Sequence, residues 1–216
     1  RPGAVPTPED EELRRLIPVL EAISGWGVPI SIDTYKPAVM QAALAAGASM
    51  INDINALRAP GALDAVRNSD CALCLMHMQG EPLNMQLAPS YCDVVQEVRD
   101  FLKERVVACR QAGISDGRLL LDPGFGFGKS LQHNLALFRA LTAATVDDLP
   151  LLVGVSRKSM LGALTGRPVE QRLSASITAA VIAAQKGAKI LRVHDVAATR
   201  DALAVWAAIE QGELCD

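Results

Sequence analysis

Short apolar runs alternate along this chain with longer segments rich in alanine and leucine, and this alternation limits the fold more than any other feature. The runs predict strands at 28–33, 49–54, 72–77, 118–123, 151–156 and 190–195. The segments between them predict helices at 9–24, 37–46, 61–68, 91–112, 130–143, 169–186 and 197–211. Strands that are apolar nearly throughout, each followed by a helix, are typical of parallel βα units with a sheet buried on both faces.

The number of units points to an incomplete barrel. A closed (β/α)8 TIM barrel needs eight units and typically about 250 residues, whereas this chain has 216 residues and about six units. The chain also opens on Arg1, in an expected loop just before a helix. We therefore predict one α/β barrel domain over 1–216 that lacks its first two strand–helix units. The alternative is an open doubly wound sheet, but the first strand–helix junction shows no nucleotide-binding pattern.

Charge and composition exclude several classes of partner. The 21 basic and 24 acidic residues give a formal net charge of -3, so the chain has no electrostatic footprint for nucleic acid. No apolar run reaches the roughly 18 residues of a membrane helix. Five cysteines, an odd number, suggest free thiols in a reducing compartment, and we expect a cytoplasmic protein. Cys71 and Cys74 lie three apart in an expected strand, which argues against a shared metal.

Polar residues stand where the apolar runs stop. In a βα barrel the carboxyl ends of all strands meet on one face, where active sites are built. At a single position such as Asp33 or Asp122, a helix N-cap is an equally good explanation, but the pattern recurs on six strands. The residues are Asp33, Asn52, Asp53, His77, Asp122, Ser156, Arg157, Lys158, Arg192 and His194.

The chemistry of these side chains suggests two kinds of ligand group. Carboxylates, an amide and an ammonium together suit a flat heterocycle edged with N–H, NH₂ and C=O groups; this set is Asp33, Asn52, Asp122 and Lys158. Arg192 and His194 are two apart on an expected strand and would share a face. With Arg1 or Arg157 nearby, they predict a site for phosphate or pyrophosphate. A core histidine is the alternative for His194.

The stretch LDPGFGFGKS at 121–130 is glycine-rich without being a nucleotide-binding motif. Pro123 and Lys129 occupy positions where the P-loop and the dinucleotide fingerprint require glycine. We expect a mobile loop that places Phe125 and Phe127 near the strand ends, able to close over a ring. Met76 is expected to pack under an aromatic ligand.

These residues carry a resemblance to a known family. The segments SIDTYK, INDI, CLMHMQG, LLLDPGFGFGK, LLVGVSRKSMLG and LRVHD resemble, in the same order, motifs of the dihydropteroate synthases of folate biosynthesis, and RPGA resembles the end of a family loop. The resemblance covers essentially the whole chain. It implies two further N-terminal strands and a loop whose asparagine contacts magnesium pyrophosphate, none of which is present here.

The resemblance also implies roles for single residues. The pterin site would comprise Asp33, Asn52, Met76, Asp122 and Lys158, and the pyrophosphate site Arg192, His194 and Arg1. The p-aminobenzoate site, which sulfonamides would share, would comprise Arg1, Pro2, Phe127 and Ser159. Mg²⁺ is the implied cofactor, with no ligand from this chain, and a homodimer is the implied assembly.

The implied reaction is displacement of pyrophosphate from (7,8-dihydropterin-6-yl)methyl diphosphate by the amine of p-aminobenzoate. Its catalytic residues would be Asp33, Asp122, Lys158, Arg192 and His194, with the Asp33 carboxylate stabilising positive charge at the methylene. Two alternatives are a pterin-binding methyltransferase of related barrel type and a catalytically silent pterin-binding fragment. The anion pair argues against the methyltransferase, since a methyl donor expels no pyrophosphate.

Overall fold

A computed structural model describes residues 3, 5–210 and 212. Within them the strands are β1 (Ser31–Asp33), β2 (Met50–Asp53), β3 (Ala72–Met76), β4 (Leu119–Asp122), β5 (Leu152–Val153) and β6 (Ile190–Leu191). The α-helices are α1 (Glu9–Ile23), α2 (Pro37–Ala45), α3 (Ala62–Val66), α4 (Val94–Gln111), α5 (Leu131–Arg139), α6 (Ser159–Thr165), α7 (Leu173–Gln185) and α8 (Val196–Glu210). Short 3₁₀ turns cover Ser24–Trp26, Asp116–Arg118, Leu141–Ala144 and Val169–Gln171.

The strands are parallel and follow chain order. β1, β2, β3 and β4 form one ladder, and β5 pairs with β6. A parallel bridge between Leu121 and Leu151 joins the two groups. The strand order is therefore the sequential order of a barrel, as the sequence predicts, rather than the rearranged order of a doubly wound sheet.

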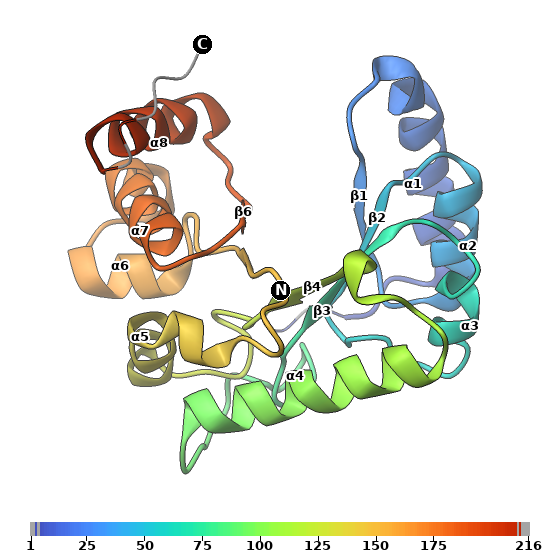
Figure 1. The fold of residues 1–216 in the computed structure, drawn as a ribbon, viewed down its shortest axis with the longest axis horizontal. Coiled ribbons are helices and arrows are strands. Elements are labelled where there is room, and N and C mark those ends of the chain that lie inside the picture. Colours follow the sequence, from blue (N-terminus) through green and yellow to red (C-terminus); the bar gives the residue numbers. More distant parts are fainter. Residues whose placement is uncertain (1–2, 4, 211, 213–216) are drawn as a thin grey trace.

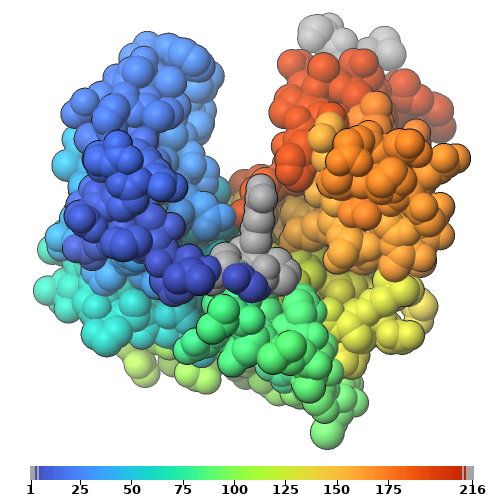
Figure 2. All heavy atoms as spheres, turned by 180° about the vertical axis from the view of Figure 1, so that it is seen from behind, coloured from blue at the N-terminus to red at the C-terminus, as the bar shows by residue number. Residues whose placement is uncertain are grey.

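The helices lie outside the curved sheet, and the curve stays open (Figure 1). Neighbouring helices pack on one another from α1 to α3 and from α4 to α8. Figure 2 shows a deep cleft between the residues of α1 and α2 and those of α7 and α8. The strands on either side of the opening, β1 and β6, are the more exposed ones, whereas β4 is buried throughout.

Two local expectations need correction. Several strands are shorter than predicted, because the ends of the apolar runs bend into loops; β6 ends at Leu191, ahead of Arg192. The helix α6 was absent from the expected elements, since Gly162 lies within it. A Cβ at Gly162 would lie 2.3 Å from Arg172 Nη2, so this glycine admits the arginine that packs across the helix.

Alternation along the strands separates the core from the cleft. In β4, Leu119 and Leu121 face outward into the main core under the helices. Leu120 faces inward with Cys74 and Leu152. Because side chains alternate with a period of two, Asp122 falls on the inward face at the end of the strand.

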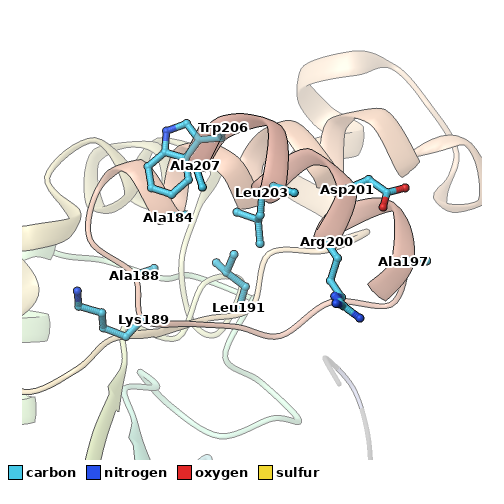
Figure 3. A pocket seen from close by; sticks show the side chains of 11 residues that line it. Ala184, Ala188, Lys189, Leu191, Ala197, Arg200, Asp201, Leu203, Trp206 and Ala207 are labelled. Atoms are coloured by element: carbon cyan, nitrogen blue, oxygen red, sulfur yellow. The ribbon is translucent and has the colours of Figure 1, made fainter. Parts of the chain in front are cut away.

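A separate apolar groove of about 800 Å³ runs along the open edge beside β6. Figure 3 shows its walls, with Leu203 and Trp206 projecting from α8 above Leu191. Thr199 is the buried residue of that helix. The groove contains none of the predicted site residues, so it is distinct from the cleft face described below.

Within the described part of the chain, no helix combines the length and apolarity needed to cross a membrane.

Candidate active site

Four predicted residues come from the inward face at the carboxyl ends of β1 to β4. Register brings them together in pairs: Asp33 lies beside Asn52, and Met76 lies beside Asp122. The amide Nδ2 of Asn52 donates to Asp33 Oδ2 at 3.0 Å. The side chain of Asp33 is 61% exposed, so its carboxylate faces the open cleft.

Asn52 carries an acceptor without a partner. The residue is 1% exposed, and its Oδ1 atom, buried itself, has no hydrogen-bond partner in the described structure. A buried unpaired acceptor costs about 1–3 kcal/mol of stability. Asn52 Oδ1 is thus set to accept an N–H from a ligand bound next to Asp33.

Asp122 is the most buried carboxylate of the group, at 2% exposed. Its Oδ1 accepts from the backbone N–H of Gly124 at 2.8 Å. Its Oδ2 accepts from Arg192 Nη2 at 3.3 Å, while Arg192 Nη1 lies 3.7 Å from Asp33 Oδ2. The guanidinium therefore stands between two carboxylates from opposite ends of the four-stranded ladder.

The position of Arg192 depends on a glycine in the neighbouring loop. The backbone N–H of Arg192 donates to Val153 O at 2.9 Å, which extends the pairing of β6 with β5 by one residue. A Cβ at Gly154 would lie 3.0 Å from Arg192 Nε. The missing side chain at this position leaves room for the guanidinium to cross to Asp122.

Lys158 precedes the first turn of α6 and reaches back over the glycine-rich loop. Its ammonium donates to Phe125 O and lies 5.0 Å from the centre of the Phe127 ring. Burial lowers the pKa of Lys158 to about 8, and the nearby Arg192 guanidinium also lowers it, while Asp122 opposes the shift. The ammonium group therefore lies over an aromatic ring and within hydrogen-bond reach of the loop backbone.

The loop at 124–128 is held by hydrogen bonds rather than free, contrary to the expectation of a mobile loop. Each of its five carbonyl groups accepts from a side chain, which fixes the loop against three other segments. The donors, in the order of the carbonyls, are Lys129, Lys158, Gln86, Lys129 and Tyr91. Its glycines have positive φ, and a Cβ at Gly124 would overlap the carbonyl of His77 at 1.8 Å.

The two phenylalanines of this loop have different roles. Phe125 is fully buried and packs against Phe138 with ring centres 5.4 Å apart, so the expectation that it closes over a ligand is wrong. Phe127 is half-buried and packs against the cluster of Met76, Met78 and Met85. Phe127 and Met76 thus lie in one methionine-rich cluster.

Sequence reasoning missed a buried pair beneath the loop. Lys129, 3% exposed, places Nζ 2.9 Å from His77 Nδ1, 3.0 Å from Gly124 O and 3.1 Å from Phe127 O. Burial lowers the pKa of Lys129 to about 7. Burial, reinforced by the Lys129 charge, lowers the pKa of His77 to about 2. His77, one residue past β3, faces outward toward Phe101 and takes no part in the cleft.

His194 reaches the same end of the sheet from a loop rather than from a strand. Since β6 ends at Leu191, the argument that Arg192 and His194 share a strand face is wrong. His194 Nδ1 lies instead 3.0 Å from the hydroxyl of Ser156, a residue of the loop after β5. His194 is exposed, which excludes the alternative of a core histidine.

The remaining predicted residues are less closely gathered. Ser159 is exposed at the start of α6 and makes no side-chain hydrogen bond within the described structure. Arg1 and Pro2 lie outside the described residues. Arg157, predicted as a further cation near the anion, pairs with Asp195 at 2.6 Å. The described residues contain no group of three or more histidine, cysteine or acidic side chains suited to hold a metal ion.

The sequence matches the family model described as "Pterin binding enzyme" over residues 1–194. It is 52% identical over 206 residues to the dihydropteroate synthase of Escherichia coli (strain K12), covering 95% of this chain and 73% of that protein.

Solved structures of dihydropteroate synthases superpose closely on this chain. The dihydropteroate synthase of Burkholderia cenocepacia, complexed with 7,8-dihydropteroate, superposes with a TM-score of 0.93 at 55% identity, over 98% of this chain and 79% of that one. The Yersinia pestis enzyme, in a sulfonamide drug complex, gives a TM-score of 0.95 at 48% identity, over 98% and 77%.

Proposed function

Because the chain belongs to the pterin-binding enzyme family and, within it, to the dihydropteroate synthases, we propose how its cleft carries out their reaction. The chain is a transferase of folate biosynthesis with the fold of a TIM barrel, of which six strands are present. The reaction joins (7,8-dihydropterin-6-yl)methyl diphosphate to p-aminobenzoate and releases pyrophosphate. The relatives' substrates and inhibitors, sulfonamides included, are accordingly those we assign to this cleft.

The unpaired Oδ1 of Asn52 is the observation that carries the placement of the pterin. A ring edge rich in N–H groups would donate to this atom and to the carboxylates of Asp33 and Asp122, which lie on either side of it in the sheet. The Lys158 ammonium would donate to a ring acceptor. Met76, fully buried at the end of β3, would support the ring from below.

The leaving group is assigned to Arg192 and His194. The bond between the methylene carbon and the diphosphate oxygen breaks, and its electrons stay on pyrophosphate. The amine nitrogen forms the new bond to the methylene carbon and gives its proton to water. The exposed Asp33 carboxylate would stabilise positive charge at the methylene. Arg192, 39% exposed between the two carboxylates, would stabilise the negative charge that develops on pyrophosphate.

The p-aminobenzoate is assigned to the side of the cleft formed by Phe127 and Ser159. The Phe127 ring offers an apolar surface below the Lys158 ammonium, and Ser159, at the first position of α6, offers an exposed hydroxyl and the start of a helix. Arg1 and Pro2 would also contribute to this subsite, as the resemblance implies. A sulfonamide would compete here because it has the same aniline ring.

Mg²⁺ does not fit a site built from the described residues. The two carboxylates of the cleft already share the Arg192 guanidinium, and Mg²⁺ prefers several oxygen ligands in octahedral geometry. We therefore propose that the ion enters with the diphosphate and takes no ligand from the described residues.

Assembly, location and domain extent are further parts of the proposal. Four large apolar side chains are exposed along α6, the turn after it and α7, namely Leu164, Val169, Leu173 and Ile182. This apolar surface supports a homodimer. Buried free thiols at Cys71, Cys74 and Cys109 support a reducing compartment such as the cytoplasm. One main core under the whole sheet supports a single domain over 1–216.

The test is pyrophosphate release from the dihydropterin diphosphate with Mg²⁺, with and without p-aminobenzoate. Release that needs p-aminobenzoate and falls about 100-fold or more in Asp122→Ala and Arg192→Ala supports the proposal. Asp122→Ala removes an acceptor proposed for the pterin, and Arg192→Ala removes the cation proposed for pyrophosphate and leaves the buried Asp122 carboxylate unpaired. Asp64→Ala, an exposed site on α3, is the matched control. Binding of the pterin without any release would instead indicate the silent pterin-binding fragment.

A further inference from the structure

We infer that Ser156 is a positioning residue that holds the imidazole of His194 in the tautomer protonated on Nε2. The inference rests on the proposed function, in which His194 contacts the departing pyrophosphate. It adds a group that itself touches no substrate and acts through His194.

The contacts of one hydroxyl group carry the argument. Ser156 is 5% exposed, and its Oγ lies 3.3 Å from the backbone nitrogen of His194 and 3.0 Å from Nδ1 of the same residue. A backbone N–H can only donate, so Ser156 Oγ accepts this first bond. The direction of the second bond then decides the tautomer of His194.

The single proton of the hydroxyl settles that direction. A serine hydroxyl has one proton to donate and two lone pairs. Among the described residues, the hydrogen-bond neighbours of Ser156 Oγ are the two nitrogens of His194. If Nδ1–H donated, the buried hydroxyl proton would have no acceptor, which native structures avoid. With the hydroxyl donating to Nδ1 all groups are paired, and the ring proton of neutral His194 lies on Nε2.

A second contact keeps the two loops together independently of Ser156. The adjacent residue Arg157 pairs with Asp195 through two bonds, of 2.6 and 3.0 Å. Its backbone N–H donates to Ser176 Oγ at 2.9 Å, and its φ of 57° is left-handed, a conformation that these bonds hold in place. Ser156 and Arg157, in the loop after β5, thus contact His194 and Asp195, in the loop after β6. Removal of the Ser156 hydroxyl also removes the acceptor of the His194 backbone N–H, but the Arg157–Asp195 pair should keep the two loops together, so the main change should be in the ring.

The tautomer decides what His194 offers to an anion. Nδ1 faces Ser156, so Nε2 lies on the far side of an exposed ring. A neutral imidazole with Nε2–H presents a donor to an oxygen of pyrophosphate, whereas the other tautomer presents a lone pair, which repels it. As the bond to the methylene breaks, the proton stays on Nε2 and the hydrogen bond strengthens with the charge on the oxygen.

The experiment reads the tautomer directly. The chain has three histidines, so ¹⁵N-histidine labelling gives three rings, and a His133→Gln sample assists assignment. We expect the neutral His194 ring of the wild type to show a protonated Nε2. In Ser156→Ala, the tautomer with Nδ1–H should become detectable. In Ser156→Thr, which keeps a hydroxyl, it should not, and Ser174→Ala, at an exposed serine of α7, is the control.

Kinetics of the same proteins link the tautomer to the reaction. Loss of this hydrogen bond should lower kcat about tenfold in Ser156→Ala and leave the KM for p-aminobenzoate within about twofold, with kcat restored by Ser156→Thr. A wild-type ring protonated on Nδ1, or a tautomer unchanged by Ser156→Ala, overturns the inference. If the spectra are as expected but the wild type releases no pyrophosphate, the proposed function and the catalytic role of Ser156 and His194 are refuted. The hydrogen bond between Ser156 and His194 would then still be supported.

Discussion

Replacement of the buried lysine, Lys129→Met, should change how stability depends on pH. Burial lowers the pKa of Lys129 to about 7 in the folded protein, while an unfolded lysine titrates near 10.4. Between these values the unfolded chain binds more protons than the folded one, so the free energy of unfolding rises with pH. The charged ammonium thus weakens the fold most below pH 7, and this penalty disappears as the pH approaches 10.

The size of the effect follows from the two pKa values. Each pH unit within the window contributes up to about 1.4 kcal/mol. From pH 7.5 to 9.5 the wild type should therefore gain about 2.5 kcal/mol that Lys129→Met does not gain. Methionine has nearly the same length and no proton to lose. The variant also loses three hydrogen bonds, which lowers its stability at every pH. The informative quantity is therefore how the difference in free energy of unfolding between wild type and Lys129→Met changes with pH.

The assay is urea unfolding at several pH values, followed by the fluorescence of the two tryptophans. Lys103→Met, at an exposed position of α4, should run parallel to the wild type because its charge is solvated in both states. A difference between wild type and Lys129→Met that changes by less than about 0.5 kcal/mol over this range, against the 2.5 kcal/mol expected by linkage, would refute the argument.

Other substitutions test separate parts of the site. Asn52→Ala should weaken pterin binding about tenfold in calorimetry but change the free energy of unfolding by less than about 1 kcal/mol, because removal of a buried acceptor without a partner offsets the lost bond from Nδ2 to Asp33. Phe125→Ala should cost about 3–5 kcal/mol in urea unfolding, whereas Phe127→Ala should chiefly raise the KM for p-aminobenzoate. Gly124→Ala should abolish activity because its Cβ would overlap a backbone oxygen, while Gly117→Ala, in open space, should not.

The residues at the ends of β1 to β4 could be predicted because a strand places alternate side chains on one face. Asp33, Asn52 and Asp122 each end an apolar run, and in a parallel sheet such ends coincide. The same rule explains His77, one residue beyond β3, which faces outward to the helices instead. Asp33 and Asp122 end their strands, whereas Asn52 precedes the last residue of β2. The register between strands therefore decides whether a polar side chain enters the cleft, and strand ends are uncertain by more than one residue from sequence.

The glycine-rich loop shows what sequence patterns leave undetermined. Alternating glycines predict positive φ, which is observed at Gly124, Gly126 and Gly128, but they do not tell whether the loop is mobile. That depends on donors from distant segments, such as Lys158 and Tyr91, for the loop carbonyls. Such donors become visible only once the barrel brings the segments together, so the sequence indicated flexibility where the structure shows a braced loop.

Arg192 illustrates the same dependence for charge. Its partners Asp33 and Asp122 lie 159 and 70 residues away along the chain, and no local pattern predicts that one guanidinium spans both. Under the proposed function, this arrangement would help an incoming diphosphate to bind. Arg192 is already oriented by the carboxylates, so an anion need not order a free side chain, which saves the entropy of ordering a long side chain, up to about 2 kcal/mol. Under the proposed function the anion would share the guanidinium with Asp122, so its binding would be favoured once the pterin has donated its own N–H groups to that carboxylate.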